Sequence, residues 1–189
     1  VLDYHSCRMC DPQFAAYKVG DAKARDIALA WGEPAVSEEP HPDDGHFPGQ
    51  LHRHGALASG TPTVLIEMTP TSMRTRWETR LIALRGAVNV MKHLGMVEGQ
   101  PELPQTQVVF HRGSEQYVFR AEQLGFATWA VPEVAVVSSG DLNAEVRSPS
   151  DFTVLQRVTA PCDGGIASAG PVESHLVLPG EELATLQPD

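Results

Sequence analysis

The chain has 189 residues, 42% of them hydrophobic and 20% charged, which is enough to bury one substantial core or a medium domain plus a small one. Its formal net charge of −10 argues against a nucleic-acid partner, because phosphate binding needs a basic surface. No apolar run has the length of a membrane span, and the first residues do not form a signal peptide. Together with an odd number of cysteines, three, these features predict reduced thiols and a cytoplasmic location.

Acidic residues outnumber basic ones mainly in the second half of the chain. Residues 1–100 contain 12 Asp or Glu against 10 Lys or Arg, a balance of −2, whereas residues 101–189 contain 12 against 4, a balance of −8. This asymmetry predicts two parts, 1–100 and 101–189, with different surfaces. Recognition of an anionic substrate is therefore expected of the first part.

Strand and helix patterns alternate in the first part. Short apolar runs predict buried strands at residues 1–5 and 62–67, and a capping Asp21 with helical apolar spacing predicts a helix at 21–31. A stretch rich in Pro, Gly, Asp and His predicts a loop at 38–50. The alternation indicates an α/β fold with a mostly parallel mixed sheet covered by helices on both faces.

The strongest helical signal runs from about Thr75 to Leu94, where Gly95 is a plausible C-terminal cap. Its apolar residues recur at spacings of three and four: Trp77, Leu81, Leu84, Val88 and Met91.

Beyond a linker at 101–104 the pattern changes to short β-rich runs separated by turn residues. The runs fall at 107–110, 134–137, 153–158 and 175–178. They predict a small all-β domain for residues 101–189.

His5 and Glu67 each follow an apolar run, at the carboxyl end of a predicted strand, where open α/β sheets place their ligand sites. A histidine at such a position is often a hydrogen-bonded structural residue. A carboxylate directly after Val-Leu-Ile is costly to bury unless it is paired or used in chemistry. A functional pair and a structural salt bridge both remain open on these grounds.

Two other motifs suggest metal binding. Cys7 and Cys10 form a Cys-x-x-Cys pair near His5, but a structural zinc site usually needs a second pair, so small buried thiols are the alternative. The stretch from His41 to Asp44 resembles the His-Pro-Asp-Asp motif of LmbE-like zinc deacetylases, although here it falls in a predicted exposed loop.

Several segments, in order along the chain, resemble the succinylglutamate desuccinylase/aspartoacylase family, relatives of the zinc carboxypeptidases. Val1–Ser6 resembles that family's Asp-x-His strand, and His54–Ala58 with Pro62–Glu67 resembles the segment ending in the catalytic Glu. Arg85–Met96 resembles the family's next helix, and Ala160–Gly165 with Leu178–Gly180 resembles the small β domain of bacterial members.

The resemblance implies a carboxypeptidase-like α/β domain that uses Zn²⁺ to hydrolyse the amide bond of an N-acyl amino acid or a related small amide. It implies that His5 is a zinc ligand and that Glu67 is the general base, which takes a proton from the attacking water and passes it to the leaving amine. Asp3 is expected to orient a ligand. Arg53 and His54 are expected near the substrate, with Arg53 a candidate for its carboxylate.

One feature departs from the family pattern. The family's other two zinc ligands lie in a His-x-x-Glu motif upstream of the Asp-x-His strand, and no His-x-x-Glu occurs in these residues. Either the sequence is part of a longer enzyme, or it is an inactive fragment or paralogue that serves as a binding or assembly module.

The β-rich second part also resembles a biotinyl/lipoyl-like hammerhead domain. A carrier role would need a lysine for attachment, and no lysine follows Lys92, so a role in packing over the active site is expected instead. The expected partners are a small-molecule substrate, neither nucleic acid nor membrane, and, compatibly with the sequence, further copies in a homo-oligomer.

Overall fold

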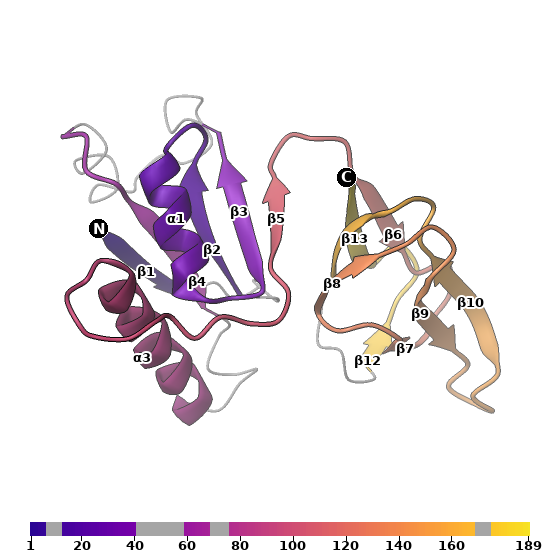
Figure 1. Ribbon diagram of the computed structural model, residues 1–189. Helices are drawn as coiled ribbons and strands as arrows, with labels where there is room; N and C mark the ends of the chain where they lie inside the picture. The colour runs from indigo at the N-terminus through magenta and orange to yellow at the C-terminus, as the bar shows by residue number, and fades with distance from the viewer. Residues whose placement is uncertain (7–12, 41–58, 69–75, 169–174) are drawn as a thin grey trace. The chain divides into compact units, whose positions relative to one another are not determined.

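The computed structural model describes residues 1–6, 13–40, 59–68, 76–168 and 175–189. The chain divides into two compact units, Val1–Gly113 and Ser114–Asp189 (Figure 1). Within the described ranges no helix is long and apolar enough to cross a membrane.

The first unit is built on a five-stranded mixed sheet in the order β1-β4-β2-β3-β5. Three neighbouring pairs are parallel (β1 with β4, β2 with β3, β3 with β5), and only β4 and β2 run antiparallel. The predicted mostly parallel mixed α/β sheet is therefore confirmed. Its strands are β1 (Leu2–Ser6), β2 (Phe14–Lys18), β3 (Ala35–Glu39), β4 (Val64–Met68) and β5 (Val108–His111).

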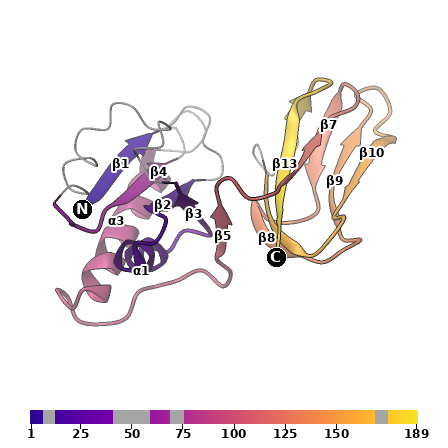
Figure 2. The same ribbon diagram turned by 90° about the horizontal axis from the view of Figure 1, so that it is seen from above.

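Both predicted helices are present, as α1 (Ala22–Trp31) and α3 (Arg76–His93). The Asp21 side chain caps α1 by accepting a hydrogen bond from the Ala24 backbone N–H, and Gly32 ends the helix at φ 88°, which glycine adopts without strain. The two helices lie side by side on one face of the sheet (Figure 2). The sequence predicted helices on both faces of the sheet, whereas the described helices cover one face.

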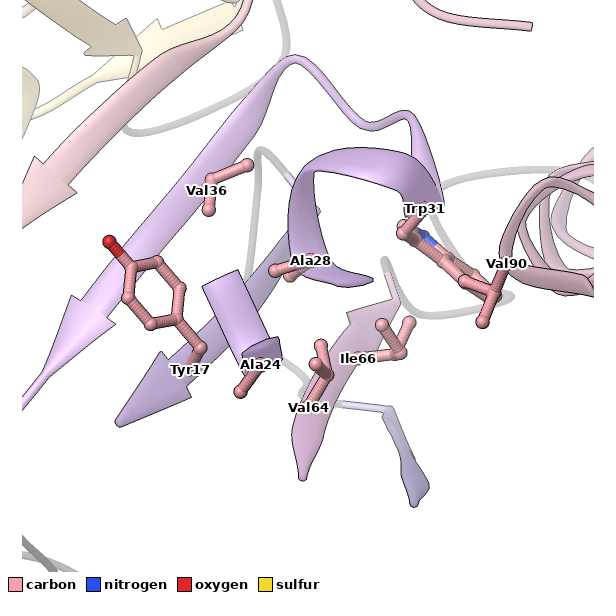
Figure 3. Packing of buried hydrophobic residues seen from close by; sticks show 9 residues of the cluster. Tyr17, Ala24, Ala28, Trp31, Val36, Val64, Ile66 and Val90 are labelled. Carbon is pink, nitrogen blue, oxygen red and sulfur yellow. The ribbon is translucent and has the colours of Figure 1, made fainter. Parts of the chain in front are cut away.

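The core of the first unit lies between α1, α3 and the sheet, around the fully buried Trp31 (Figure 3). Gly86 of α3 lets that ring approach, because a Cβ at this position would lie 2.4 Å from the indole. Asn89, 1% exposed, then links three segments: its amide donates to the carbonyls of Trp31 and Glu102 and accepts from the Glu102 N–H. These contacts fix α3 against α1.

The described residues of the second unit form two four-stranded sheets, ordered β10-β9-β7-β12 and β6-β13-β11-β8. Two buried clusters share Phe119 and Trp129 at their margins, so one continuous apolar interior supports both sheets. The strands are β6 (Tyr117–Arg120), β7 (Gly125–Trp129), β8 (Val134–Val137), β9 (Leu142–Arg147), β10 (Val154–Thr159), β11 (Gly164–Ser168), β12 (His175–Val177) and β13 (Glu182–Pro188).

The boundary between the units differs from the predicted one at residue 100. The run at 107–110, assigned from the sequence to the β domain, forms β5 and pairs with β3 of the first sheet. Gln107 also anchors this strand, because its amide donates to the carbonyls of Leu29 and Glu33 at the end of α1. The division therefore falls after Gly113.

Candidate functional site

The parallel register of β1 and β4 brings His5 and Glu67 together. The two residues are direct partners near the carboxyl ends of adjacent strands, as predicted from the apolar runs that precede them. Val64 and Ile66 face the helices as part of the core, and side chains alternate along a strand, so Glu67 points from the opposite face. Tyr4 likewise contacts Trp31 on the helix side, which leaves Asp3 and His5 on the face of Glu67.

The imidazole of His5 lies between two carboxylates. Its Nε2 is 3.3 Å from Asp3 Oδ2, and its Nδ1 is 3.8 Å from Glu67 Oε1. The first pair is a close ion-pair contact, and the second lies beyond hydrogen-bonding distance. This arrangement leaves Nδ1 directed toward the same space as the Glu67 carboxylate.

Glu67 holds its carboxylate in a largely buried position, where a negative charge is unfavourable. Its side chain is 13% exposed, and its Oε2 is buried without a hydrogen-bond partner among the described residues. Burial raises the pKa of the Glu67 carboxyl above its ordinary value; the His5 ring opposes this effect, and the negative charge of Asp3 adds to it. A carboxylate made more basic in this way is suited to accepting a proton.

These side chains fit a metal ion in part. Imidazole nitrogen and carboxylate oxygen are both ligands that zinc accepts, and an aspartate on the far nitrogen of a histidine is the usual way to orient such a ligand. A catalytic zinc, however, needs three protein ligands. In the described part of the chain, no group of three His, Cys, Asp or Glu side chains is placed to hold a metal.

Other residues singled out in the sequence lie outside the described ranges, so their predicted roles stay predictions. They are Arg53 and His54, expected near the substrate, the Cys7 and Cys10 pair, and the stretch from His41 to Asp44.

A buried polar network near the same edge of the sheet was missed by sequence reasoning. The Glu33 carboxylate accepts hydrogen bonds from Gln13 Nε2 at 2.6 Å and from Arg85 Nη2 at 3.0 Å. Gln13 directly precedes Phe14, the β2 partner of Glu67, so the network fixes the strand next to the site. The available signal was a carboxylate placed directly after the glycine that ends α1.

No protein-family model matches the sequence, and no curated protein matches it either. Similarity appears at the level of structure. The apo structure of the ectoine utilization protein EutE (DoeB) from Ruegeria pomeroyi matches with a TM-score of 0.60 and 20% sequence identity over 100% of this chain and 59% of that one.

Two further solved structures match this chain to a similar extent. A succinylglutamate desuccinylase/aspartoacylase from Rhodobacter sphaeroides matches with a TM-score of 0.56 and 20% identity, over 100% of this chain and 57% of that one. A putative member of the same family from Shewanella amazonensis matches with a TM-score of 0.59 and 16% identity, over 98% and 53%. This chain thus spans a little over half the length of the structures it matches. The predicted resemblance is confirmed at the level of the fold, which is that of succinylglutamate desuccinylase/aspartoacylase family proteins.

Proposed function

We propose that this chain is the larger part of a metal-dependent deacylase that hydrolyses the amide bond of an N-acyl amino acid or a related small amide. The observation that carries the proposal is the grouping of Asp3, His5 and Glu67 on one face at the ends of β1 and β4. Structural neighbours named for desuccinylase and aspartoacylase activity support the same reaction class. In this proposal the first unit is the carboxypeptidase-like catalytic part and the second a hammerhead-like β domain, in a cytoplasmic protein.

His5 is the ligand that this chain brings to the metal, through Nδ1. Asp3 holds the opposite nitrogen and so keeps the ring in the required tautomer and orientation. When bound, Zn²⁺ would polarise the acyl carbonyl and increase the acidity of water. The remaining ligands come from residues outside the described ranges or outside the printed sequence.

Glu67 moves the proton. Its carboxylate takes a proton from the water that attacks the acyl carbon, and the same oxygen returns the proton to the nitrogen of the leaving amino acid as the amide bond breaks. The raised pKa helps the first half of this cycle, because a more basic carboxylate accepts the proton more readily. In the second half the leaving amine, which is more basic than any carboxylate, takes that proton. Arg53 and His54 are proposed to bind the substrate, with Arg53 on its carboxylate.

The test is hydrolysis of a panel of N-acyl amino acids by the longest product of the gene, with and without a metal chelator. Glu67→Gln should lower kcat by a factor of roughly 10²–10⁴, the usual contribution of proton transfer, with little change in KM. The matched control is Glu38→Gln, which removes a partly exposed carboxylate paired with His111 at the other end of the sheet. Unchanged hydrolysis after chelation, or by Glu67→Gln, would show that the mechanism is wrong.

A second function, that of an inactive binding or assembly module, is favoured by the incomplete ligand set. Equilibrium dialysis with Zn²⁺ distinguishes the two functions. A gene product that retains stoichiometric zinc, and loses it on His5→Ala, supports the hydrolase. One that binds no zinc and cleaves nothing supports the module.

A further inference from the structure

A row of side chains crosses the first sheet at the level of the candidate site. His5 on β1 is the register partner of Glu67 on β4, and Glu67 is in turn the register partner of Phe14 on β2. Directly opposed residues of neighbouring strands lie on the same face, and in an antiparallel pair their Cβ atoms are about 5 Å apart. Phe14 therefore flanks Glu67 on the side away from His5.

The alternation of side chains along β2 places Phe14 on the same face. Ala15 and Tyr17 of this strand pack in the core beneath the helices, as do Val64 and Ile66 of β4 (Figure 3). The residues between them point to the opposite face, which is the face of Glu67. Phe14 is half-buried, so part of its ring is accessible beside the carboxylate.

The surroundings of Phe14 on this face are apolar. Its register partner on β3 is Ala35, which is 3% exposed. Two residues farther along β4 and β2 lies the pair Leu65 and Ala16, which are 3% and 0% exposed. None of these side chains carries a polar group, so the surface that continues from Glu67 across β2 to β3 is hydrocarbon.

Positive charge lies far from Phe14 on this face. Among the described residues of the first unit, alternation places two cationic side chains here, Lys18 and Arg112. Lys18 is four residues beyond Phe14 on β2, or about 13 Å at 3.3 Å per residue. Arg112 follows β5 at the same end of the sheet and is held by the Glu39 carboxylate at 2.8 Å. A carboxylate next to Phe14 would therefore have no described cation to pair with.

The order of the row decides which part of a substrate lies next to Phe14. In the proposed function, the acyl carbonyl is polarised at the His5 end of the row, and Glu67 returns a proton to the nitrogen of the leaving amino acid. The amino acid continues from that nitrogen, on the side of Glu67 away from His5. Its side chain consequently meets Phe14, whereas the acyl group extends away from it.

We propose that Phe14 is a specificity-determining residue, and that the leaving amino acid carries an apolar side chain, which packs on the Phe14 ring, rather than a second carboxylate. This inference rests on the proposed function and adds the class of amino acid to it. An apolar side chain of several methylene groups that contacts such a surface favours its substrate by about tenfold or more over one that lacks it.

The experiment measures kcat/KM of the longest product of the gene for three substrates that share one acyl group and carry leucine, glycine or aspartate. The leucine derivative should be cleaved at least about tenfold more efficiently than the other two. Phe14→Ala should lower the leucine-to-glycine ratio of kcat/KM about tenfold, and Phe14→Leu, which keeps an apolar side chain, should retain most of it. A general loss of folded enzyme cancels in this ratio, because both substrates report on the same active fraction.

Phe110→Ala is the matched control. Phe110 is a half-buried phenylalanine on the same face, but it lies on β5, three strands away from Glu67 in the sheet. Its substitution should leave the ratio unchanged. A ratio that Phe14→Ala does not lower, or that Phe110→Ala lowers equally, would overturn the inference and leave the deacylase proposal standing. Faster cleavage of the aspartate derivative than of the leucine derivative would do the same, whereas cleavage of no N-acyl amino acid would overturn both.

Discussion

Replacing Glu67 by glutamine is expected to stabilise the metal-free chain, although it lowers the proposed activity. The Glu67 carboxylate is nearly buried, and in the described part of the chain one of its oxygens has no hydrogen-bond partner. A buried polar group without a partner costs about 1–3 kcal/mol, and more if it is charged. Glutamine keeps the shape and still buries an amide, so we expect a gain of about 1 kcal/mol at pH 7, or about 4 °C in the unfolding temperature of the first unit.

The pH dependence of this gain follows from the raised pKa. Between the unfolded pKa of about 4.3 and the higher folded value, the folded state binds more protons than the unfolded state, so stability falls as pH rises through this range. Below about pH 4 the carboxyl is protonated in both states, and the penalty disappears. The advantage of Glu67→Gln should therefore grow as pH rises above the unfolded pKa and disappear below about pH 4.

Urea unfolding followed by circular dichroism, in the presence of chelator, measures the free energy of unfolding of the parent and the variant at pH 7 and below pH 4. Glu39→Gln is the control, because Glu39 is buried in the same sheet, with its side chain 4% exposed, but accepts hydrogen bonds from Ser37 at 2.7 Å and Arg112 at 2.8 Å. That substitution should destabilise the chain by about 1–3 kcal/mol. Loss of stability in Glu67→Gln at pH 7, or a gain that persists unchanged at low pH, would refute the reasoning.

Four further substitutions, at three positions, test the packing, a buried hydrogen-bond network and an ion pair. Gly86→Ala should lower the free energy of unfolding by about 1–3 kcal/mol, because its Cβ would overlap the Trp31 ring; thermal unfolding measures this, and an unchanged midpoint would contradict the close contact. Asn89→Ala should cost about 2 kcal/mol, since it removes a buried side chain that accepts from the Glu102 N–H and donates to the Trp31 and Glu102 carbonyls, whereas Asn89→Asp should retain part of that stability. The hydrogen bond from Arg157 holds the pKa of Glu145 below its usual value, as do the bond and charge of Arg147, so Glu145→Gln should destabilise the chain at pH 7 and converge with the parent as pH falls through that lowered pKa.

The strands that carry the site could be predicted because their signals are local. An apolar run ending in a polar residue suffices to locate β1 and β4, and capping plus helical spacing suffice for α1 and α3. The strand β2 was missed because Ala15 and Ala16 have weak strand propensity, and both are buried only by the completed sheet. The strand β3 ends in Glu38 and Glu39, which the sequence assigned to a loop because their pairing with β5 is not a local signal.

Part of the site depends on contacts that no local pattern encodes. The pairing of β2 antiparallel to β4, and the Glu33 network beside it, join residues far apart in the chain. Likewise β5 was assigned to the wrong unit, because a four-residue β-rich run does not specify which sheet it joins. His5 and Glu67 could be singled out from the sequence as a candidate ligand and a candidate base, but their separation and the burial of Glu67 could not be predicted.

The position of β1 at the margin of its sheet has a consequence for how the protein would lose activity. Among the described strands, the one that carries His5 opposite Glu67 is bonded on one side only, and its neighbour β4 is bonded on both. Such a strand detaches at a lower free-energy cost than the rest of the unit unfolds. Warming should therefore separate the ligand from the base while α1, β2 and β3 remain native. Inactivation is expected at a lower temperature than global unfolding, and covering the strand from outside should bring the two temperatures together.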